Sequence, residues 1–261
     1  MDLGIKNRVA LVMSAGGGLG SAIALALARE GATVAVSDQN SQALEDTVSR
    51  IREAGGTAHG FQADLADLEN ISAMVADVRR TVGDPDILIN NSGGPPPSLA
   101  TGVAPQQWRK QFDSMVVSLI HLTDLLLPAM KQRGWGRIIT STSSGVVAPI
   151  ANLGISNALR LALVGWSKTL ANEVAADGIC VNVVLPGRIA TDRIRSLDEA
   201  RAGREGKTYE EVVAASTASI PARRYGKPEE YADAVTFLAS ERAAFITGSV
   251  VRVDGGMIPS I

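Results

Sequence analysis

Cysteine and histidine are scarce in this chain of 261 residues, which contains one Cys and two His. Cys180 has no partner for an internal disulfide and lies in the apolar run GICVNVV, so we interpret it as a small buried residue. An unpaired cysteine fits a reducing compartment, and we expect a cytoplasmic protein. His59 and His121 form no cluster with cysteine, so the sequence predicts no metal site.

The sequence also lacks a strong charge of one sign and a long hydrophobic run. The formal net charge is -2, and no long basic stretch is present, so we expect no nucleic-acid partner. The first residues, MDLGIKNRVA, contain no apolar h-region, so we expect no signal peptide. No uncharged apolar stretch reaches about 18 residues, so we expect no membrane span. The composition, 46% hydrophobic and 20% charged, is typical of a globular protein.

Short apolar runs alternate with longer helical patterns along the whole chain. The expected strands are residues 8–13, 33–37, 57–64, 86–91, 136–142, 179–185 and 250–254. The expected helices are residues 19–31, 41–55, 68–83, 105–131, 154–176 and 228–240, with Ser41 as an N-cap and Gly31 and Gly55 as helix ends. This alternation predicts an α/β fold, a single Rossmann-type doubly wound parallel sheet with helices on both faces.

No Pro/Gly/Ser-rich linker divides the chain, so we expect one domain over residues 1–261. Residues 191–220 interrupt the alternation with the charged stretch DRIRSLDEARAGREGKTYEE. We interpret this segment as a helical insertion over the carboxyl edge of the sheet that serves as a substrate lid. A solvated surface excursion without function is the alternative.

A glycine-rich loop, VMSAGGGLGSAIA, joins the first expected strand to the first expected helix. Glycines allow close approach to phosphates, and a helix N-terminus supplies free N–H donors, although glycines also serve tight turns. Asp38 ends the second expected strand, where a carboxylate can bind the ribose hydroxyls of an adenosine and repel a 2′-phosphate. No Arg or Lys accompanies it, so we expect NAD in preference to NADP. A helix cap or a turn is the alternative role for Asp38.

The chain resembles the short-chain dehydrogenase/reductase family, particularly the branch of the β-ketoacyl-ACP reductases, from Asn7 to about Met257. The family's Thr-Gly-x-x-x-Gly-x-Gly loop corresponds to a stretch in which Met13 and Ser14 replace Thr-Gly while Gly18, Leu19 and Gly20 fit. The resemblance implies further cofactor-binding residues at Asp64, Leu65, Asn91 and Gly93, and in the motif PGRIAT at Pro186, Gly187, Ile189 and Thr191.

The same resemblance implies four catalytic positions, and three of them carry unexpected residues. Ser143 occupies the serine position, with Ser144 one step along as an alternative. Ser156 stands where the family has the proton-donating Tyr, and Arg160 stands where it has the Lys that lowers the Tyr pKa. Met115 stands at the position of the Asn that organises a relay water. Ser143, Ser156 and Arg160 are therefore the candidate catalytic residues, and Arg160 is also a candidate cofactor-binding residue that would hold the nicotinamide ribose, as the resemblance implies for the family's Lys.

These replacements leave three hypotheses for the reaction. The first is an atypical NAD-dependent oxidoreductase in which Ser143 and Ser156 hold the substrate oxygen. Arg160 or Arg188 would stabilise negative charge, and Tyr209 or water would supply the proton; two arginines would suit an anionic substrate. Pairing with Asp192 is the alternative role for Arg188. The second hypothesis is a cofactor-binding pseudoenzyme that acts as a sensor or scaffold, and the third is an elimination or epimerisation.

The expected helices at 105–131 and 154–176 are unusually apolar for surface helices. One face can pack on the sheet, and the remaining apolar surface indicates a partner or ordinary core packing. The resemblance implies that these two helices form a homodimer interface and that two dimers form a homotetramer.

Overall fold

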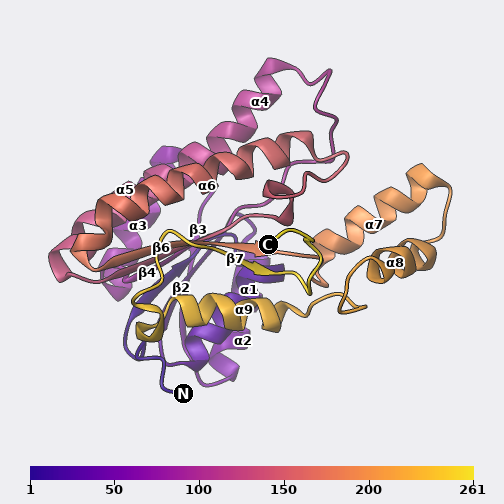
Figure 1. The fold of residues 1–261 in the computed structure, drawn as a ribbon. Helices are drawn as coiled ribbons and strands as arrows, with labels where there is room; N and C mark the ends of the chain where they lie inside the picture. The colour runs from indigo at the N-terminus through magenta and orange to yellow at the C-terminus, as the bar shows by residue number, and fades with distance from the viewer.

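A parallel sheet of seven strands forms the centre of the computed structural model, which describes residues 1–261 (Figure 1). The strand order is β3-β2-β1-β4-β5-β6-β7, and all neighbouring strands are parallel. The strands are β1 (Val9–Val12), β2 (Thr33–Asp38), β3 (Thr57–Gln62), β4 (Ile87–Asn90), β5 (Gly136–Ser141), β6 (Ile179–Pro186) and β7 (Val250–Val253). The predicted doubly wound parallel sheet is therefore confirmed. The order reverses between β1 and β4, and ligands of such sheets bind beyond the carboxyl ends of those strands.

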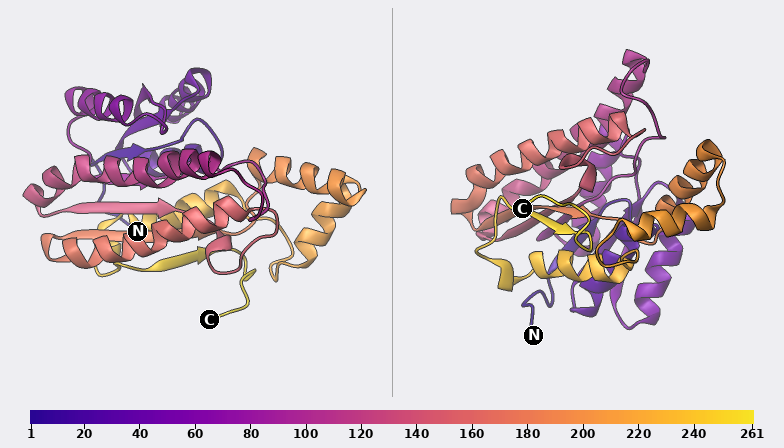
Figure 2. Two further views of the ribbon diagram at one scale, coloured as in Figure 1. Left: turned by 90° about the horizontal axis from the view of Figure 1, so that it is seen from above. Right: turned by 45° about the vertical axis from the view of Figure 1, so that its right-hand side comes forward.

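Helices cover both faces of the sheet (Figure 2). On one face lie α1 (Gly18–Arg29), α2 (Ser41–Glu53) and α9 (Pro228–Leu238), which contribute to a core cluster of 26 buried residues. On the other face lie α3 (Leu68–Val82), α5 (Ser118–Arg133) and α6 (Gly154–Val174), which contribute to a cluster of 18. Strand β1 supplies Ala10 and Val12 to the first cluster and Leu11 to the second, because successive side chains of a strand point to opposite faces.

The expected elements form with ends that differ by at most two residues from those read in the sequence. One capping residue was wrong. Asn40, not Ser41, caps α2, since its Oδ1 accepts a hydrogen bond from the Ala43 N–H at 3.2 Å. Ser41 is instead the first helical residue. Gly31 and Gly55 follow their helices with φ of +84°, as expected of helix-terminating glycines.

The helical stretch expected at 105–131 is continuous but irregular. It consists of α4 (Pro105–Phe112), a π-helical turn (Asp113–Val117) and α5. The π turn contains Met115, which is buried against Ile155 and other residues of α6. Such turns concentrate at functional sites. By length and composition this stretch is apolar enough to cross a membrane, but core helices of globular proteins have the same properties, and α5 packs into the sheet's core.

Two further helices, α7 (Asp192–Glu205) and α8 (Tyr209–Ala218), project beyond the carboxyl edge of the sheet (Figures 1 and 2). Thr191 caps α7 through its Oγ1, and Thr208 forms a capping box with Glu211 at the start of α8. The segment 191–220 is therefore helical, as expected. Its action as a lid remains a prediction.

Candidate active site

The glycine-rich loop between β1 and α1 is tightly packed inside and accessible outside. Gly20 is required because a Cβ atom there would lie 2.4 Å from the Ser14 carbonyl oxygen. Ser14 has φ of +47°, in the left-handed region, where a side chain costs about 1 kcal/mol relative to glycine. Gly17 faces open space, with no atom within 4 Å of where its Cβ would be. The backbone N–H groups at the start of α1 are thus accessible to a phosphate.

Asp38 lies beside this loop at the end of β2. Its Oδ2 accepts a hydrogen bond from the Gly16 N–H at 2.9 Å, and its Oδ1 accepts one from the Asn40 N–H at 3.0 Å. A carboxylate has about four lone-pair sites, so acceptor capacity remains for ribose hydroxyls. The carboxylate therefore both holds the loop and presents negative charge where an adenosine ribose would lie.

The segment after β4 forms the opposite wall. The Asn91 amide donates hydrogen bonds to the carbonyl oxygens of Met13 at 3.3 Å and Ser14 at 3.1 Å, which ties this wall to the glycine-rich loop. Gly93 faces open space on its Cβ side. Beyond β3, the Asp64 carboxylate accepts the Ala66 N–H within its own turn, and Leu65 packs on the core.

The loop from Pro186 to Thr191, which follows β6, completes the cleft. A Cβ atom on Gly187 would lie 2.6 Å from the Asp254 Cα, so glycine is required at this close approach. Ile189 is buried and forms a bridge with Gly226. The Thr191 Cγ2 lies 3.7 Å from the position of a Cβ on Gly18, so this loop faces the glycine-rich loop.

A dinucleotide fits this arrangement of open glycine backbone and acidic ribose site. Gly17 and Gly93 leave two stretches of backbone that no side chain covers, one at the start of α1 and one past β4. Asp38 lies at one end of the path, and Arg160, described below, lies at the other. The cofactor-binding residues expected from the sequence therefore come from the carboxyl ends of β1, β2, β3, β4 and β6, with Arg160 added from α6.

Ser143 and Ser156 lie close to this edge on separate elements. Ser143 follows β5, and its Oγ accepts a hydrogen bond from the Gly145 N–H at 3.0 Å, so its own proton remains available to a substrate oxygen. Ser144, the alternative, is buried. Ser156 lies in the first turn of α6 and is also buried.

Arg160 lies one turn further along α6 with a buried guanidinium. It donates hydrogen bonds to the carbonyl oxygens of Ser141 at 3.3 Å, Ser92 at 3.2 Å and Gly93 at 3.3 Å. Burial lowers its pKa to about 10; the Tyr231 phenol opposes this shift and the charge of Arg193 adds to it. Arg160 therefore remains charged at neutral pH, and carbonyl dipoles rather than a carboxylate compensate its charge.

Arg193 is the residue of this site that the sequence did not single out. It extends from the first turn of α7 to the loop after β4, where its Nη2 donates to the Pro95 carbonyl oxygen at 2.7 Å. The same nitrogen lies 2.9 Å from the position of a Cβ on Gly94. Burial lowers the pKa of Arg193. Its sequence context, a run of charged residues, is typical of a solvated helix and contained no signal for this contact.

Two expectations for the lid segment were wrong. Arg188 pairs neither with a site anion nor with Asp192; it donates to the buried Asp198 carboxylate, because α7 turns that residue inward. Tyr209 stacks with Arg195, whose Cζ lies 5.8 Å from the ring centroid, on the lid rather than at Ser156.

The phenol of Tyr231 is not a substitute proton donor. Its side chain is fully buried in α9, and its hydroxyl lies 2.8 Å from the Ser141 Oγ and donates to the Val184 carbonyl oxygen at 3.3 Å. Burial raises the pKa of Tyr231 far above the ordinary range of a phenol. The group therefore supports the end of β5 from the face opposite α6.

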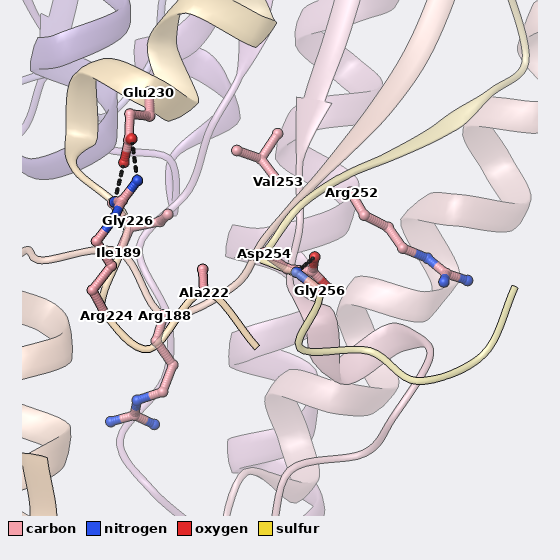
Figure 3. A pocket seen from close by; sticks show the side chains of 11 residues that line it. Arg188, Ile189, Ala222, Arg224, Gly226, Glu230, Arg252, Val253, Asp254 and Gly256 are labelled. Atoms are coloured by element: carbon pink, nitrogen blue, oxygen red, sulfur yellow. Dashed lines mark hydrogen bonds and ion pairs between the residues drawn. The ribbon is translucent and has the colours of Figure 1, made fainter. Parts of the chain in front are cut away.

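A cavity of about 370 Å³ lies behind the β6–α7 loop (Figure 3). Its lining includes Arg188, Arg224 and Arg252, but none of Ser143, Ser156 and Arg160. Arg224 points to both carboxylate oxygens of Glu230, as Figure 3 shows, and Arg252 bonds the chain terminus at Ser260. The arginines of this cavity thus already have hydrogen-bond partners, and the cavity shares the loop after β6 with the cleft through Arg188 and Ile189.

The chain is similar to known proteins over nearly its whole length. The family model described as enoyl-(acyl carrier protein) reductase matches residues 14–258. The 3-oxoacyl-(acyl-carrier-protein) reductase FabG of Escherichia coli strain K12 is 37% identical over 261 residues, covering 98% of this chain and 99% of the relative. Nodulation protein G of Azospirillum brasilense is 34% identical over 254 residues, covering 97% and 99%.

A solved structure with the same fold is that of L-sorbose reductase from Gluconobacter frateurii, described as complexed with NADPH and L-sorbose. It superposes with a TM-score of 0.94 at 33% identity, and the match covers 100% of both chains. The similarity in sequence and the similarity in structure therefore both extend over nearly the whole chain.

Proposed function

Because the chain belongs to the short-chain dehydrogenase/reductase family, we propose that it is an oxidoreductase that transfers a hydride between NAD(H) and a carbonyl or alcohol substrate. The observation that carries this proposal is the continuity of the site. A dinucleotide cleft with the Asp38 carboxylate at one end leads to the Ser143 hydroxyl and the Arg160 guanidinium at the other.

We expect NAD rather than NADP because of the charge at Asp38. Its carboxylate forms no ion pair and accepts two backbone N–H groups, so its negative charge remains beside the ribose position. A 2′-phosphate placed there would meet electrostatic repulsion. The NADPH named for L-sorbose reductase is a property of that protein.

The residues on this chain suit a reduction without a phenol. When bound, the nicotinamide cofactor supplies the hydride. The Ser143 hydroxyl donates to the substrate oxygen, and Ser156 offers a second hydroxyl near it. Arg160 stabilises negative charge on that oxygen through its fixed positive charge. A guanidinium does not give up its proton near neutral pH, so water supplies it, and we expect a rate about 10²–10⁴ lower than with a tuned general acid.

A cofactor-binding protein without turnover is the second candidate. The observation in its favour is that the Arg160 guanidinium is already bonded to three backbone carbonyl oxygens. In that arrangement Arg160 holds the walls of the cleft together and does not take part in chemistry. Such a protein would use nucleotide binding for sensing or as a scaffold.

We also propose that the chain forms a homodimer or homotetramer through α4, α5 and α6. Phe112 and Leu161 on these helices are 42% and 53% exposed in the single chain, and we expect the oligomer to bury them. We expect a small-molecule substrate and a cytoplasmic location, the latter because Cys180 is unpaired and buried.

Calorimetric titration of the purified protein with NADH and, separately, with NADPH tests the proposal. Tight NADH binding with weak NADPH binding supports the cofactor assignment. A panel of ketones, aldehydes, oxo acids and alcohols then tests turnover by NADH absorbance. Nucleotide binding with no turnover across the panel supports the second candidate. Absence of binding to either nucleotide refutes both.

A further inference from the structure

Two guanidinium groups lie near one another at the mouth of the cleft, and neither pairs with a carboxylate. Arg160 comes from α6 and Arg193 from α7, and both donate hydrogen bonds to the loop after β4, Arg160 to Ser92 and Gly93 and Arg193 to Pro95. Three other arginines on or beside the lid pair with carboxylates: Arg188 with Asp198, Arg195 with Glu199 and Arg201 with Glu205. Arg160 and Arg193 instead place two positive charges on the loop after β4 with only carbonyl oxygens as partners.

Arg193 forms a hydrogen bond that a stronger acceptor can replace. Its Nη2 donates to the Pro95 carbonyl oxygen at 2.7 Å, and its guanidinium packs against Gly94. The side chain also keeps solvent exposure. A neutral carbonyl is a weaker acceptor than an ionised oxyanion, which can bind a guanidinium through two parallel hydrogen bonds. An oxyanion that reaches this position would therefore displace Pro95.

Arg160 and Arg193 differ in how readily a ligand could replace their hydrogen-bond partners. Arg160 is buried and bonded to carbonyl oxygens of Ser141, Ser92 and Gly93, so exchange would break three hydrogen bonds. Arg193 has one such bond, to the same loop two residues further along. It is therefore the member of the pair that is free to bind a ligand, while Arg160 adds positive charge behind it.

Resting on the proposed function, we propose that Arg193 is a specificity-determining residue that binds an oxyanion group, a carboxylate or a phosphate, of a carbonyl substrate. Gly94 is part of this site, since a side chain there would occupy the position of the guanidinium.

The site is distinct from that expected for the cofactor phosphates. The accessible N–H groups at the start of α1 lie beside Gly17 and Gly18, and the lid segment approaches them through Thr191, not Arg193. Arg193 reaches instead to Pro95. Loss of its guanidinium should therefore weaken oxyanion binding and leave nucleotide binding unchanged.

The test uses the full chain saturated with NADH and titrated in a calorimeter with oxalate and, separately, with inorganic phosphate. The variants are Arg193→Gln, Arg193→Lys and, as a matched control, Arg195→Gln, which removes an exposed arginine of the same helix that pairs with Glu199. We expect wild type and the control to bind at least one oxyanion. Arg193→Gln should weaken oxyanion binding about tenfold or more, and Arg193→Lys should weaken it less. NADH affinity should remain within about twofold of the wild-type value in both variants. The anion that binds better identifies carboxylate or phosphate.

Three outcomes would overturn the assignment: no oxyanion binding by wild type, equal binding by Arg193→Gln, or a loss of NADH affinity in Arg193→Gln that matches its loss of oxyanion affinity. The last would place the guanidinium at the nucleotide. Turnover of 3-oxobutanoate and of its methyl ester gives a second reading, since Arg193→Gln should lower kcat/KM for the acid only. If neither compound is reduced, the proposed reaction fails for these substrates, but the oxyanion titrations still test the role of Arg193. Failure of the proposed reaction and failure of the Arg193 assignment are therefore distinguishable.

Discussion

Arg188 donates a hydrogen bond to the buried carboxylate of Asp198, and this ion pair fastens α7 to the loop that follows β6. The Tyr225 hydroxyl donates to the same carboxylate at 2.8 Å. In α7 only Asp198 and Ala202 are buried, so the helix has little apolar contact with the rest of the chain. The position of the lid therefore depends on this polar cluster together with the hydrogen bond from Arg193 to Pro95.

Replacement of this carboxylate should loosen the lid. Asp198→Asn leaves the partly buried Arg188 guanidinium without its counter-charge, and we expect the free energy of unfolding to fall by about 1–3 kcal/mol. Urea unfolding measures the change. Glu199→Gln, which removes an exposed partner of Arg195, should change it by less than about 0.5 kcal/mol. Equal effects of the two substitutions would contradict this account.

Restoring a phenol and an amine should increase turnover. In the double variant Ser156→Tyr, Arg160→Lys, a phenol whose pKa is lowered by the adjacent ammonium can donate the proton that the wild-type residues do not. We expect kcat to rise about 10²-fold for a ketone substrate, measured by NADH oxidation. Adding Ser143→Ala to the double variant should remove the gain. Unchanged turnover in a correctly folded double variant would mean that α6 does not place these residues at the substrate.

Arg160 should not make NADH affinity depend on pH between 6 and 9. Its pKa, lowered to about 10 by burial, lies below the ordinary value of 12.5, so the charged form costs stability at every pH below about 10 and the cost falls only above it. Between pH 6 and 9 neither its charge nor its contribution to stability changes. NADH affinity, measured by fluorescence titration, should therefore be constant there with respect to this group.

The variant Arg160→Lys, by contrast, should show an NADH affinity that depends on pH. An ordinary lysine pKa of about 10.4 falls on burial, so the variant should lose its charge, and with it NADH affinity, as pH rises toward 9. A decline in wild type as steep as in the variant would show that another group titrates.

Asp38 should control the choice of nucleotide. Asp38→Ala removes the acceptor for the ribose hydroxyls and the charge that opposes a 2′-phosphate. We expect NADH affinity to fall about tenfold and NADPH affinity to rise, as measured by calorimetry. Asp46→Asn, on the exposed side of α2, is the charge-matched control and should leave both affinities unchanged. A parallel loss of both nucleotides would indicate that Asp38 serves only to hold the Gly16 N–H.

The apolar surface of α6 should mediate assembly. Leu161→Glu places a charge on a side chain that is 53% exposed in the single chain, and we expect it to reduce the oligomer to smaller species in light scattering. Leu68→Glu makes the same change at an exposed leucine on α3 and should leave the mass unchanged. A wild-type protein that is already monomeric would refute the interface.

The fold was readable because its physical causes are local. Apolar runs such as Val9–Val12 are typical of strands that helices cover on both faces, as in a parallel sheet, and helical periodicity with a terminal glycine marks Gly18–Arg29 as a helix. The same alternation of strands and helices predicts that the glycine-rich loop and Asp38 lie close together, because the carboxyl ends of successive parallel strands meet at one edge of the sheet. The capping residue of α2 was misread because Asn40 and Ser41 are both good caps and only the backbone at that turn distinguishes them.

The sequence by itself thus determined the sheet, its helices and the cofactor edge, together with the residue types at positions 143, 156 and 160. Only the tertiary structure decided which arginine near the start of α7 reaches the loop after β4. Arg188 and Arg193 are close in sequence, but the loop before α7 directs one to Asp198 and the first turn directs the other to Pro95, 98 positions away. Long side chains in a charged segment take their partners from whichever surface the fold brings near, and no local pattern contains that information.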